Sequence, residues 1–122
     1  MLTYHILLVA CGGALGAVAR YACGLAVSSS GFPWATYAVN VLGCLLIGFI
    51  AAGFPRLGEP ARLFLVVGLL GGFTTFSAFS FEFFALLDRR ETAAAFLYVA
   101  ATLLAGAGAF AIGRAGARWL AA

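Results

Sequence analysis

Hydroxyl-bearing and aromatic residues alternate in one segment of the chain, between Gly71 and Phe84. Within it, Phe76, Phe79 and Phe83 have the i, i+3 and i+7 spacing of a single helical face. The edge of an aromatic ring is electropositive and hydroxyl groups donate hydrogen bonds, so together they could solvate a small anion. Packing of the rings in a protein core is the alternative, and the spacing fits both.

Two hydroxyl pairs accompany these rings. Ser77 and Ser80 stand three residues apart and predict a hydroxyl track on a neighbouring face. Just before them, Gly71 and Gly72 are followed closely by Thr74 and Thr75, a pattern that favours a helix break. Carbonyl groups freed by such a break must face protein, water or an ion, and carbonyl cages hold monovalent cations. A kink filled by the threonine hydroxyls is the alternative.

Three further polar residues interrupt apolar stretches: Arg20, Asn40 and Glu82. An ionisable side chain inside a membrane span costs roughly 2.5–3.5 kcal/mol, so each one suggests a function. Arg20 either extends from a helix end toward water or attracts anions to an entrance. Asn40 either donates its amide hydrogens to an anion or joins two helices. Glu82 either lies near the membrane surface or accepts hydrogen bonds from hydroxyl or backbone groups.

The composition shows what must position these residues. The chain has 122 residues, of which 65% are hydrophobic and 9% charged, whereas soluble domains carry roughly 25% charged residues. Sixteen glycines also fit a membrane protein. The chain is predicted to be an all-α integral membrane protein, with one transmembrane domain over residues 1–122. Its charged residues are spread over several short loops and never form a run along the sequence, so nucleic-acid binding is not expected, and no protein partner is evident.

Three polar clusters, at 28–33, 55–60 and 88–91, separate four apolar stretches that are each long enough to cross a bilayer. The predicted transmembrane helices cover about 2–26, 34–54, 63–87 and 92–113. The first resembles a signal peptide, but no Lys or Arg precedes it and the apolar stretch continues past Cys11, which predicts an uncleaved helix. Cys11, Cys23 and Cys44 are expected to be buried thiols.

Four spans place the two termini and the 55–62 loop on one side of the membrane. That side carries four arginines and the other side carries two, Arg89 and Arg90. This bias is too weak to fix one orientation, so an antiparallel dimer is permitted. Small residues four apart predict close helix packing, either within a subunit or between subunits; the pairs are Gly12 with Gly16, Gly13 with Ala17, and Gly68 with Gly72.

Three motifs resemble the Fluc (CrcB) family of fluoride channels, and the likeness covers nearly the whole chain. They are Gly-Gly-Ala-Leu-Gly-Ala-Val-Ala-Arg-Tyr at 12–21, Thr-Tyr-Ala-Val-Asn-Val-Leu-Gly at 36–43, and Gly-Gly-Phe-Thr-Thr-Phe-Ser at 71–77. The resemblance implies passive export of fluoride, which confers fluoride resistance. It also implies an antiparallel, dual-topology homodimer with two pores near the subunit interface, in the plasma (inner) membrane of a bacterium.

The resemblance also implies roles for individual residues. Phe76 and Phe79 would line the pore, Asn40 would donate to fluoride and Arg20 would lie in the vestibule. The backbone carbonyls of Gly71 and Thr74 from each copy would bind a structural sodium ion (Na+). Further contacts along the fluoride path are expected from five polar side chains and one tyrosine: Thr75, Ser77, Ser80 and Tyr98, with Thr36 and Glu82 as support.

Two other functions compete with this one. A small multidrug-resistance-type exporter of cations is also short and four-spanning, but its proton coupling needs a carboxylate early in the chain. The first span has Arg20 and no acid, which leaves Glu82 as the candidate. A scaffold subunit without transport would leave Asn40 and the phenylalanine stripe unexplained. No catalytic or cofactor motif is present, so the chain is not expected to be an enzyme.

Overall fold

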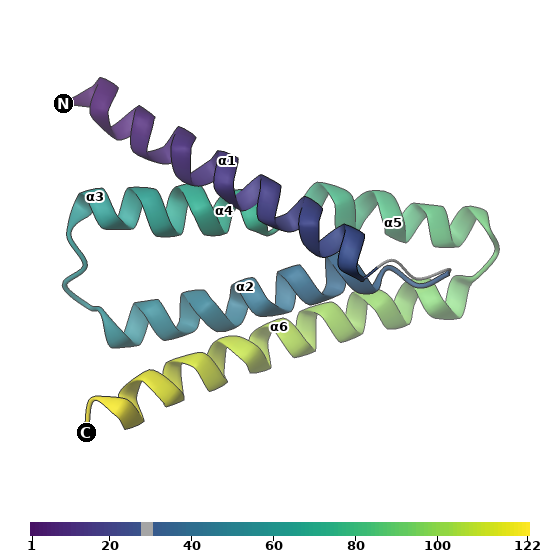
Figure 1. Cartoon of the computed structure of the whole chain (residues 1–122). Helices are drawn as coiled ribbons and strands as arrows, with labels where there is room; N and C mark the ends of the chain where they lie inside the picture. Colours follow the sequence, from purple (N-terminus) through teal and green to yellow (C-terminus); the bar gives the residue numbers. More distant parts are fainter. Residues whose placement is uncertain (28–30) are drawn as a thin grey trace.

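The computed structural model describes residues 1–27 and 31–122, and the regular structure in that part consists of helices, with no strand. Four stretches are long and apolar enough to cross a membrane. Three are single helices: α1 (Leu2–Ala26), α2 (Trp34–Gly53) and α6 (Thr92–Leu120). The other, Glu59–Asp88, is a succession of four elements (Figure 1). These are α3 (Glu59–Arg62), η1 (Leu63–Leu70), α4 (Gly71–Phe73) and α5 (Phe76–Asp88).

Proline and charge mark the connections, as the sequence predicts. Pro33 immediately precedes α2, and Pro60 lies in the first turn of α3, where its missing N–H costs nothing. Of the predicted turn at 28–33, residues 28–30 lie outside the described residues. The last helix continues past residue 113, the predicted end of the fourth span, to Leu120. The length of the apolar stretch therefore underestimates the length of α6, because a helix can continue past the last residue of the apolar stretch.

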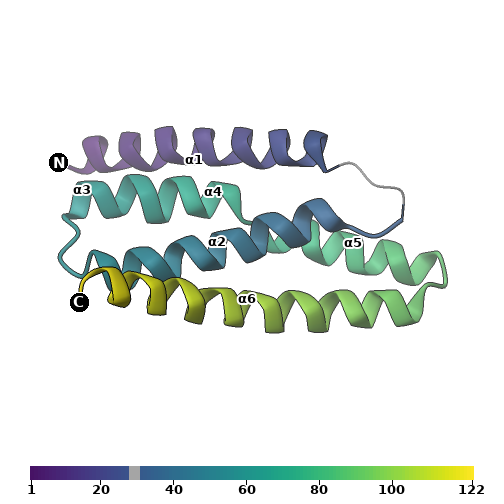
Figure 2. The ribbon, with the colours of Figure 1, turned by 60° about the horizontal axis from the view of Figure 1, so that its bottom comes forward.

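The element η1 is a π-helix, in which the hydrogen bonds follow an i→i−5 pattern. At its end the Gly71 N–H donates to the Val66 carbonyl in that pattern. Both termini and the connection from α2 to α3 lie at one end of the molecule, and the connection from α5 to α6 lies at the other (Figure 2). This arrangement agrees with the sidedness expected from four spans.

Glycines pack α1 directly against η1 and α4. A Cβ atom added to Gly12 or Gly16 would overlap the carbonyl oxygens of Phe64 and Leu69. From the opposite helix, Gly68 and Gly72 also approach the backbone of α1 closely. We call these four glycines the first seam; they show that the Gly12–Gly16 and Gly68–Gly72 pairs pack within one subunit.

A second seam joins α2 to α6 and consists of Gly48 and Gly113. A Cβ atom on Gly48 would overlap the Phe110 carbonyl oxygen, and one on Gly113 would overlap that of Leu45. Near the end of the same contact, a Cβ atom on Gly53 would lie 3.3 Å from Ala117 Cβ. Helices that approach this closely gain van der Waals contact, which drives association in lipid.

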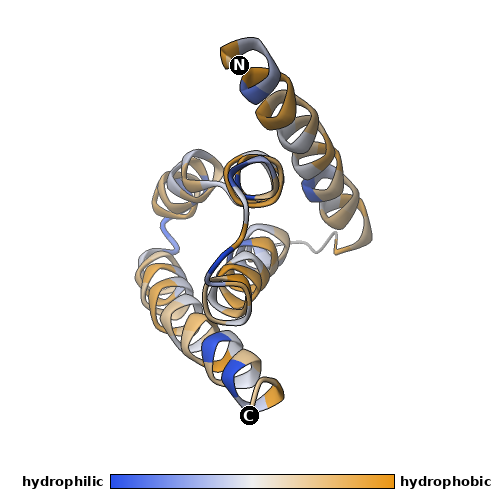
Figure 3. Cartoon of the chain, turned by 90° about the vertical axis from the view of Figure 1, so that its left-hand side faces the viewer, coloured by the Kyte–Doolittle hydropathy of each residue, from blue (hydrophilic) through white to orange (hydrophobic). Residues whose placement is uncertain are grey.

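The outer faces of the helices are mostly hydrophobic (Figure 3), and many large apolar side chains are exposed, as suits contact with lipid. The buried core is small and lies mainly between α5 and α6, where it consists of Phe79, Leu86, Ala95 and Tyr98. One expectation for the cysteines is wrong: Cys11 is exposed, because it lies on an outward face of α1, whereas Cys23 and Cys44 are partly buried. All three are free thiols.

Candidate functional site

The backbone between α4 and α5 is extended at two successive threonines. Thr74 has φ −81° and ψ 158°, and Thr75 has φ −152° and ψ 122°. The Thr75 hydroxyl accepts a hydrogen bond of 3.1 Å from the Ala78 N–H, so Thr75 is the N-cap of α5. The Thr74 hydroxyl donates to the Leu70 carbonyl at 2.9 Å. Both side chains thus satisfy backbone groups beside the extended segment.

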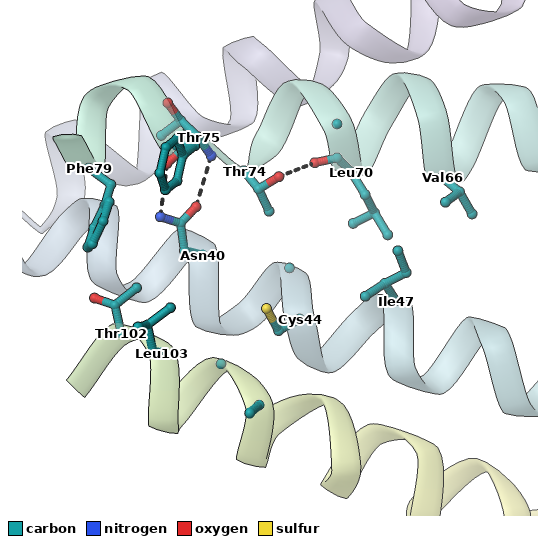
Figure 4. A pocket seen from close by; sticks show the side chains of 15 residues that line it. Asn40, Cys44, Ile47, Val66, Leu70, Thr74, Thr75, Phe79, Thr102 and Leu103 are labelled. Carbon is teal, nitrogen blue, oxygen red and sulfur yellow. Dashed lines mark hydrogen bonds between the residues drawn. The ribbon is translucent and has the colours of Figure 1, made fainter. Parts of the chain in front are cut away.

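Asn40 of α2 binds this extended segment through both ends of its amide. Its Nδ2 donates to the Thr75 carbonyl at 3.0 Å, and its Oδ1 accepts from the Thr75 N–H at 2.8 Å (Figure 4). An amide fits this role because it carries a donor and an acceptor side by side. One N–H of Nδ2 is engaged by Thr75, and the amide has a second N–H to offer.

These bonds change which carbonyls receive helical hydrogen bonds. In an uninterrupted α-helix the Thr75 N–H would donate to the Gly71 carbonyl, and the Ala78 N–H would donate to the Thr74 carbonyl. Here the first N–H donates to Asn40 and the second to the Thr75 hydroxyl. The carbonyls of Gly71 and Thr74 therefore lose their ordinary helical donors.

A mostly apolar cavity of about 550 Å³ opens beside this segment (Figure 4). Four of the predicted site residues from α5 and the extended segment line it together with Asn40 and Gly71. Of its two aromatic rings, Phe76 is 78% exposed and Phe79 is 9% exposed, and their centroids are 5.7 Å apart. The cavity is lined by residues of α2, η1, α4, the extended segment, α5 and α6. They are Asn40, Gly43, Cys44, Ile47, Val66, Leu70, Gly71, Thr74, Thr75, Phe76, Phe79, Thr102, Leu103, Gly106 and Ala107.

Thr102 is a cavity residue that the sequence did not single out. Its Oγ1 is buried and has no hydrogen-bond partner among the described residues. The side chain projects from α6 toward the cavity beside Asn40 and Phe79 (Figure 4). A usable signal was its position one helical turn after Tyr98, because residues four apart share a face. An unpartnered buried hydroxyl is unusual and requires an explanation.

A second cavity, of about 210 Å³, lies on the other side of Thr75 and is lined by Arg20, Thr36 and Glu82 among others. Within residues 1–27 and 31–122, Thr75 is the one residue that lines both cavities. Arg20 donates from Nε to the Gly72 carbonyl at 3.1 Å, which fixes its guanidinium against the end of α4. Its two terminal nitrogens can serve other acceptors.

Glu82 accepts a hydrogen bond at each carboxylate oxygen. The Thr36 hydroxyl donates to Oε1 at 2.7 Å, and the Tyr98 hydroxyl donates to Oε2 at 2.8 Å. Of the alternatives for Glu82, the structure thus shows hydroxyl contacts. Tyr98 and Thr36 are buried, and together with Glu82 they join α2, α5 and α6.

The remaining predicted residues lie away from the two cavities. Ser77 is exposed, with its hydroxyl 3.3 Å from that of Thr75. The Ser80 hydroxyl donates to the Phe76 carbonyl at 3.0 Å, so it serves its own helix. Tyr98 lines neither cavity and contacts Phe79 ring to ring at 5.0 Å. The structure therefore brings Asn40, Gly71, Thr74, Thr75, Phe76 and Phe79 together at one cavity and Arg20, Thr36 and Glu82 at the other.

Comparison with known proteins gives a family match over most of the chain. The model of the family described as "CrcB-like protein, Camphor Resistance (CrcB)" matches residues 7–114. A protein of Nitrobacter winogradskyi named "Fluoride-specific ion channel FluC" is 46% identical over 114 residues, which cover 88% of this chain and 90% of the relative.

Two further relatives carry the same name. The protein of Chlorobium chlorochromatii is 47% identical over 122 residues, covering 96% of this chain and 95% of its own length. That of Novosphingobium aromaticivorans is 50% identical over 105 residues, covering 80% of this chain and 83% of its own length.

Proposed function

The chain belongs to the CrcB family, as its motifs predict, and on that premise we propose that it is a channel for fluoride. It is a multi-pass membrane protein, and the proposed activity is passive, fluoride-selective conduction. The relatives are named as fluoride-specific ion channels, which supports the substrate and agrees with the prediction that the chain is not an enzyme. Export of fluoride from the cytoplasm across a bacterial inner membrane, with resistance to fluoride as the result, completes the proposal.

The observation that carries the proposal is the fixed Asn40 amide, which lines the same cavity as Phe76 and Phe79. A small, strongly hydrated anion needs closely placed donors to replace its water. The two bonds to Thr75 hold the amide in one orientation, so its second N–H costs little entropy to present. The electropositive ring edges add contact without a fixed cation that would retain the ion.

Thr102 fits the same role on α6. Its side chain lines the cavity, and its buried hydroxyl has no protein partner in the described part of the chain, so it has a hydrogen bond to give to an anion. The second cavity would then serve as the vestibule. Arg20 supplies positive charge there, and the hydroxyls of Thr36 and Tyr98 offset the negative charge of Glu82. Because Thr75 borders both cavities, it would lie where an ion passes from one to the other.

An antiparallel homodimer, with two pores near its interface, is part of the proposal. The main cavity is open and apolar, and Gly71 and Phe76 at its rim are exposed in the single chain. A second copy would bury these residues and enclose the ion path. The four-to-two distribution of arginines permits insertion in both directions.

A structural Na+ at the centre of the dimer is supported by the chemistry of the carbonyl groups. No group of three or more His, Cys, Asp or Glu that could hold a metal occurs in residues 1–27 and 31–122, whereas the Gly71 and Thr74 carbonyls are freed from their helical donors. Neutral carbonyl oxygens suit a hard monovalent cation. Replacing sodium with N-methylglucamine should lower the dimer fraction. Fluoride flux driven by a sodium gradient would contradict a purely structural role.

The decisive experiment measures fluoride and chloride efflux from liposomes that contain the purified protein, with an ion-selective electrode for each anion. We expect rapid fluoride release and negligible chloride release. Phe76→Leu should reduce fluoride release to the level of protein-free liposomes. Phe81→Leu is the matched control, because Phe81 lies on the same helix, is 76% exposed against 78% for Phe76, and does not line the cavity.

Two outcomes would reject the proposal. One is no fluoride release from folded wild-type protein, and the other is equal loss in the Phe76 and Phe81 variants. The cation-exporter alternative is tested by Glu82→Gln, which would abolish proton-coupled transport but should leave substantial fluoride conduction. A scaffold subunit would show no flux at all.

A further inference from the structure

The two ends of the molecule differ in charge. The end that carries the termini has four arginines, Arg56, Arg62, Arg114 and Arg118, and one acid, Glu59. The opposite end has Asp88, Arg89, Arg90 and Glu91, whose formal charges cancel. The formal excess of positive charge in the whole chain, +3, therefore lies at the terminal end. Hydrophilic segments are visible at this end near the C-terminus and in the connection between α2 and α3 (Figure 3).

The arginines of the two ends also differ in what they contact. At the neutral end, Arg89 forms an ion pair with Glu91 at 3.2 Å and donates to the Gly31 carbonyl at 2.7 Å. The four arginines of the terminal end are all exposed, and none of their side chains forms a hydrogen bond or ion pair within the described residues. Their guanidinium groups are therefore available to an external anion.

Helix length places these four arginines at the level of the lipid headgroups. The uncharged stretch of α6, residues 92–113, is about 33 Å long at 1.5 Å per residue, and a hydrocarbon core is about 30 Å thick. Arg114 thus lies at the edge of the hydrocarbon and Arg118 one turn further out. Arg56 follows the end of α2 at Gly53, and Arg62 precedes the apolar η1, so both lie at the same level.

We propose that this arginine cluster binds the headgroups of anionic phospholipids. Arg56 and Arg62 lie in the connection after α2 and in α3, and the other two arginines lie near the end of α6. The contact between Gly53 and Ala117 holds α2 beside α6 at this end of the molecule. Arg114 and Arg118 stand four residues apart on one helical face, so two guanidinium groups can converge on one phosphate. Exposed Trp119 follows directly and suits the membrane–water interface.

The chain provides a reporter at each end, because its two tryptophans are Trp119 at the arginine-rich end and Trp34 at the neutral end. The experiment uses W34F and W119F proteins, each with one tryptophan, in bilayers of phosphatidylcholine. A nitroxide-labelled lipid, either phosphatidylglycerol or phosphatidylcholine, is then added at equal mole fraction. Short-range quenching of tryptophan fluorescence reports which lipid is enriched at that end.

We expect labelled phosphatidylglycerol to quench Trp119 more than labelled phosphatidylcholine, and to quench Trp34 no more than phosphatidylcholine does. A basic residue at the surface changes affinity for anionic lipid by about fivefold. R114Q/R118Q should therefore remove most of the preference at Trp119, and high salt should weaken it. R89Q/R90Q is the matched control and should leave the preference unchanged.

Three results would overturn the proposal: equal preference at both tryptophans, a preference that survives R114Q/R118Q together with R56Q/R62Q, or displacement of the labelled lipid by inorganic phosphate at constant ionic strength. The last result would assign the arginines to a free anion. All four positions are exposed, and circular dichroism of each variant establishes that it is folded. The single variants R114Q and R118Q, each expected to show a partial loss, provide the test if the double variant does not fold.

Discussion

The glycine seams and the cavity between them differ in what holds the helices together. At the seams, backbone meets backbone: Gly16 faces the Leu69 carbonyl and Gly113 faces that of Leu45. At the cavity, the contact between α2 and the segment that joins α4 to α5 includes two hydrogen bonds between the Asn40 side chain and the Thr75 backbone. The seams pack backbone against backbone and contribute no polar side chain, whereas the cavity is lined in part by polar side chains and leaves space between the helices unfilled.

This difference separates stability from activity in a chain of only 122 residues. Each seam joins two helices into a pair, α1 with η1 and α4, and α2 with α6. The polar residues proposed to act on the ion lie where the two pairs meet. Changes at the seams should therefore affect folding first, and changes at the cavity should affect conduction first.

The largest effect is expected from Gly113→Ala. The added Cβ would overlap the Leu45 carbonyl, and overpacking of this kind costs about 3 kcal/mol. Gly108→Ala on the same helix is the control, because a Cβ there meets nothing within 4 Å; it should be neutral or slightly stabilising. Thermal unfolding in detergent measures both. Similar melting temperatures for the two variants would mean that the seam does not limit stability.

A smaller loss of stability, together with a loss of conduction, is expected from Asn40→Ala. The variant removes both hydrogen bonds to Thr75, and interhelical hydrogen bonds in membranes contribute about 0.6 kcal/mol each, with a maximum of about 1.7. Folded protein should be recoverable, but fluoride efflux should be lost. Fluoride efflux at the wild-type rate from this variant would show that Asn40 does not contact the ion. Changes at the cavity would then not affect conduction before stability.

The smallest effect on stability is expected from Thr102→Val. The hydroxyl is buried without a partner in the described residues, and replacing it with a methyl group removes an uncompensated desolvation cost. Stability should stay the same or rise slightly, while fluoride efflux falls. The melting temperature and the fluoride efflux, measured on the same preparation, test the expected change in stability and the expected fall in conduction. A clear loss of stability would show that the hydroxyl has a structural partner.

Much of the architecture was predictable because a bilayer requires long apolar helices. Predicted spans at 2–26 and 34–54 match α1 and α2 closely, since Ser, Pro and charge interrupt the hydropathy at their ends. The extent of α6 was not predictable from apolar length, because the helix continues to Leu120 beyond the uncharged stretch that ends before Arg114. The π-helical pattern of η1 also gave no signal, since its residues are uniformly apolar.

The site was predictable in part. The types of Asn40, Thr75 and Phe76 are conspicuous in apolar helices, so composition alone drew attention to them. The direction of each side chain was not predictable, because it depends on which helices are neighbours. The spacing of Ser80 predicts a hydroxyl track, whereas its hydroxyl donates to the Phe76 carbonyl of its own helix. Thr102 carries no signal of its own, because a single threonine in a span is common.

The second seam also constrains the order of events during synthesis. Gly48 and Gly113 lie about 65 residues apart, so at roughly 5–20 residues per second their contact must wait about 3–13 s after Gly48 is made. During that interval α2 is in the membrane without the helix that fits it, while the first seam needs only the third span. A chaperone or insertase that shields the glycine face of α2 would therefore be useful at one stage of synthesis, before α6 emerges from the ribosome.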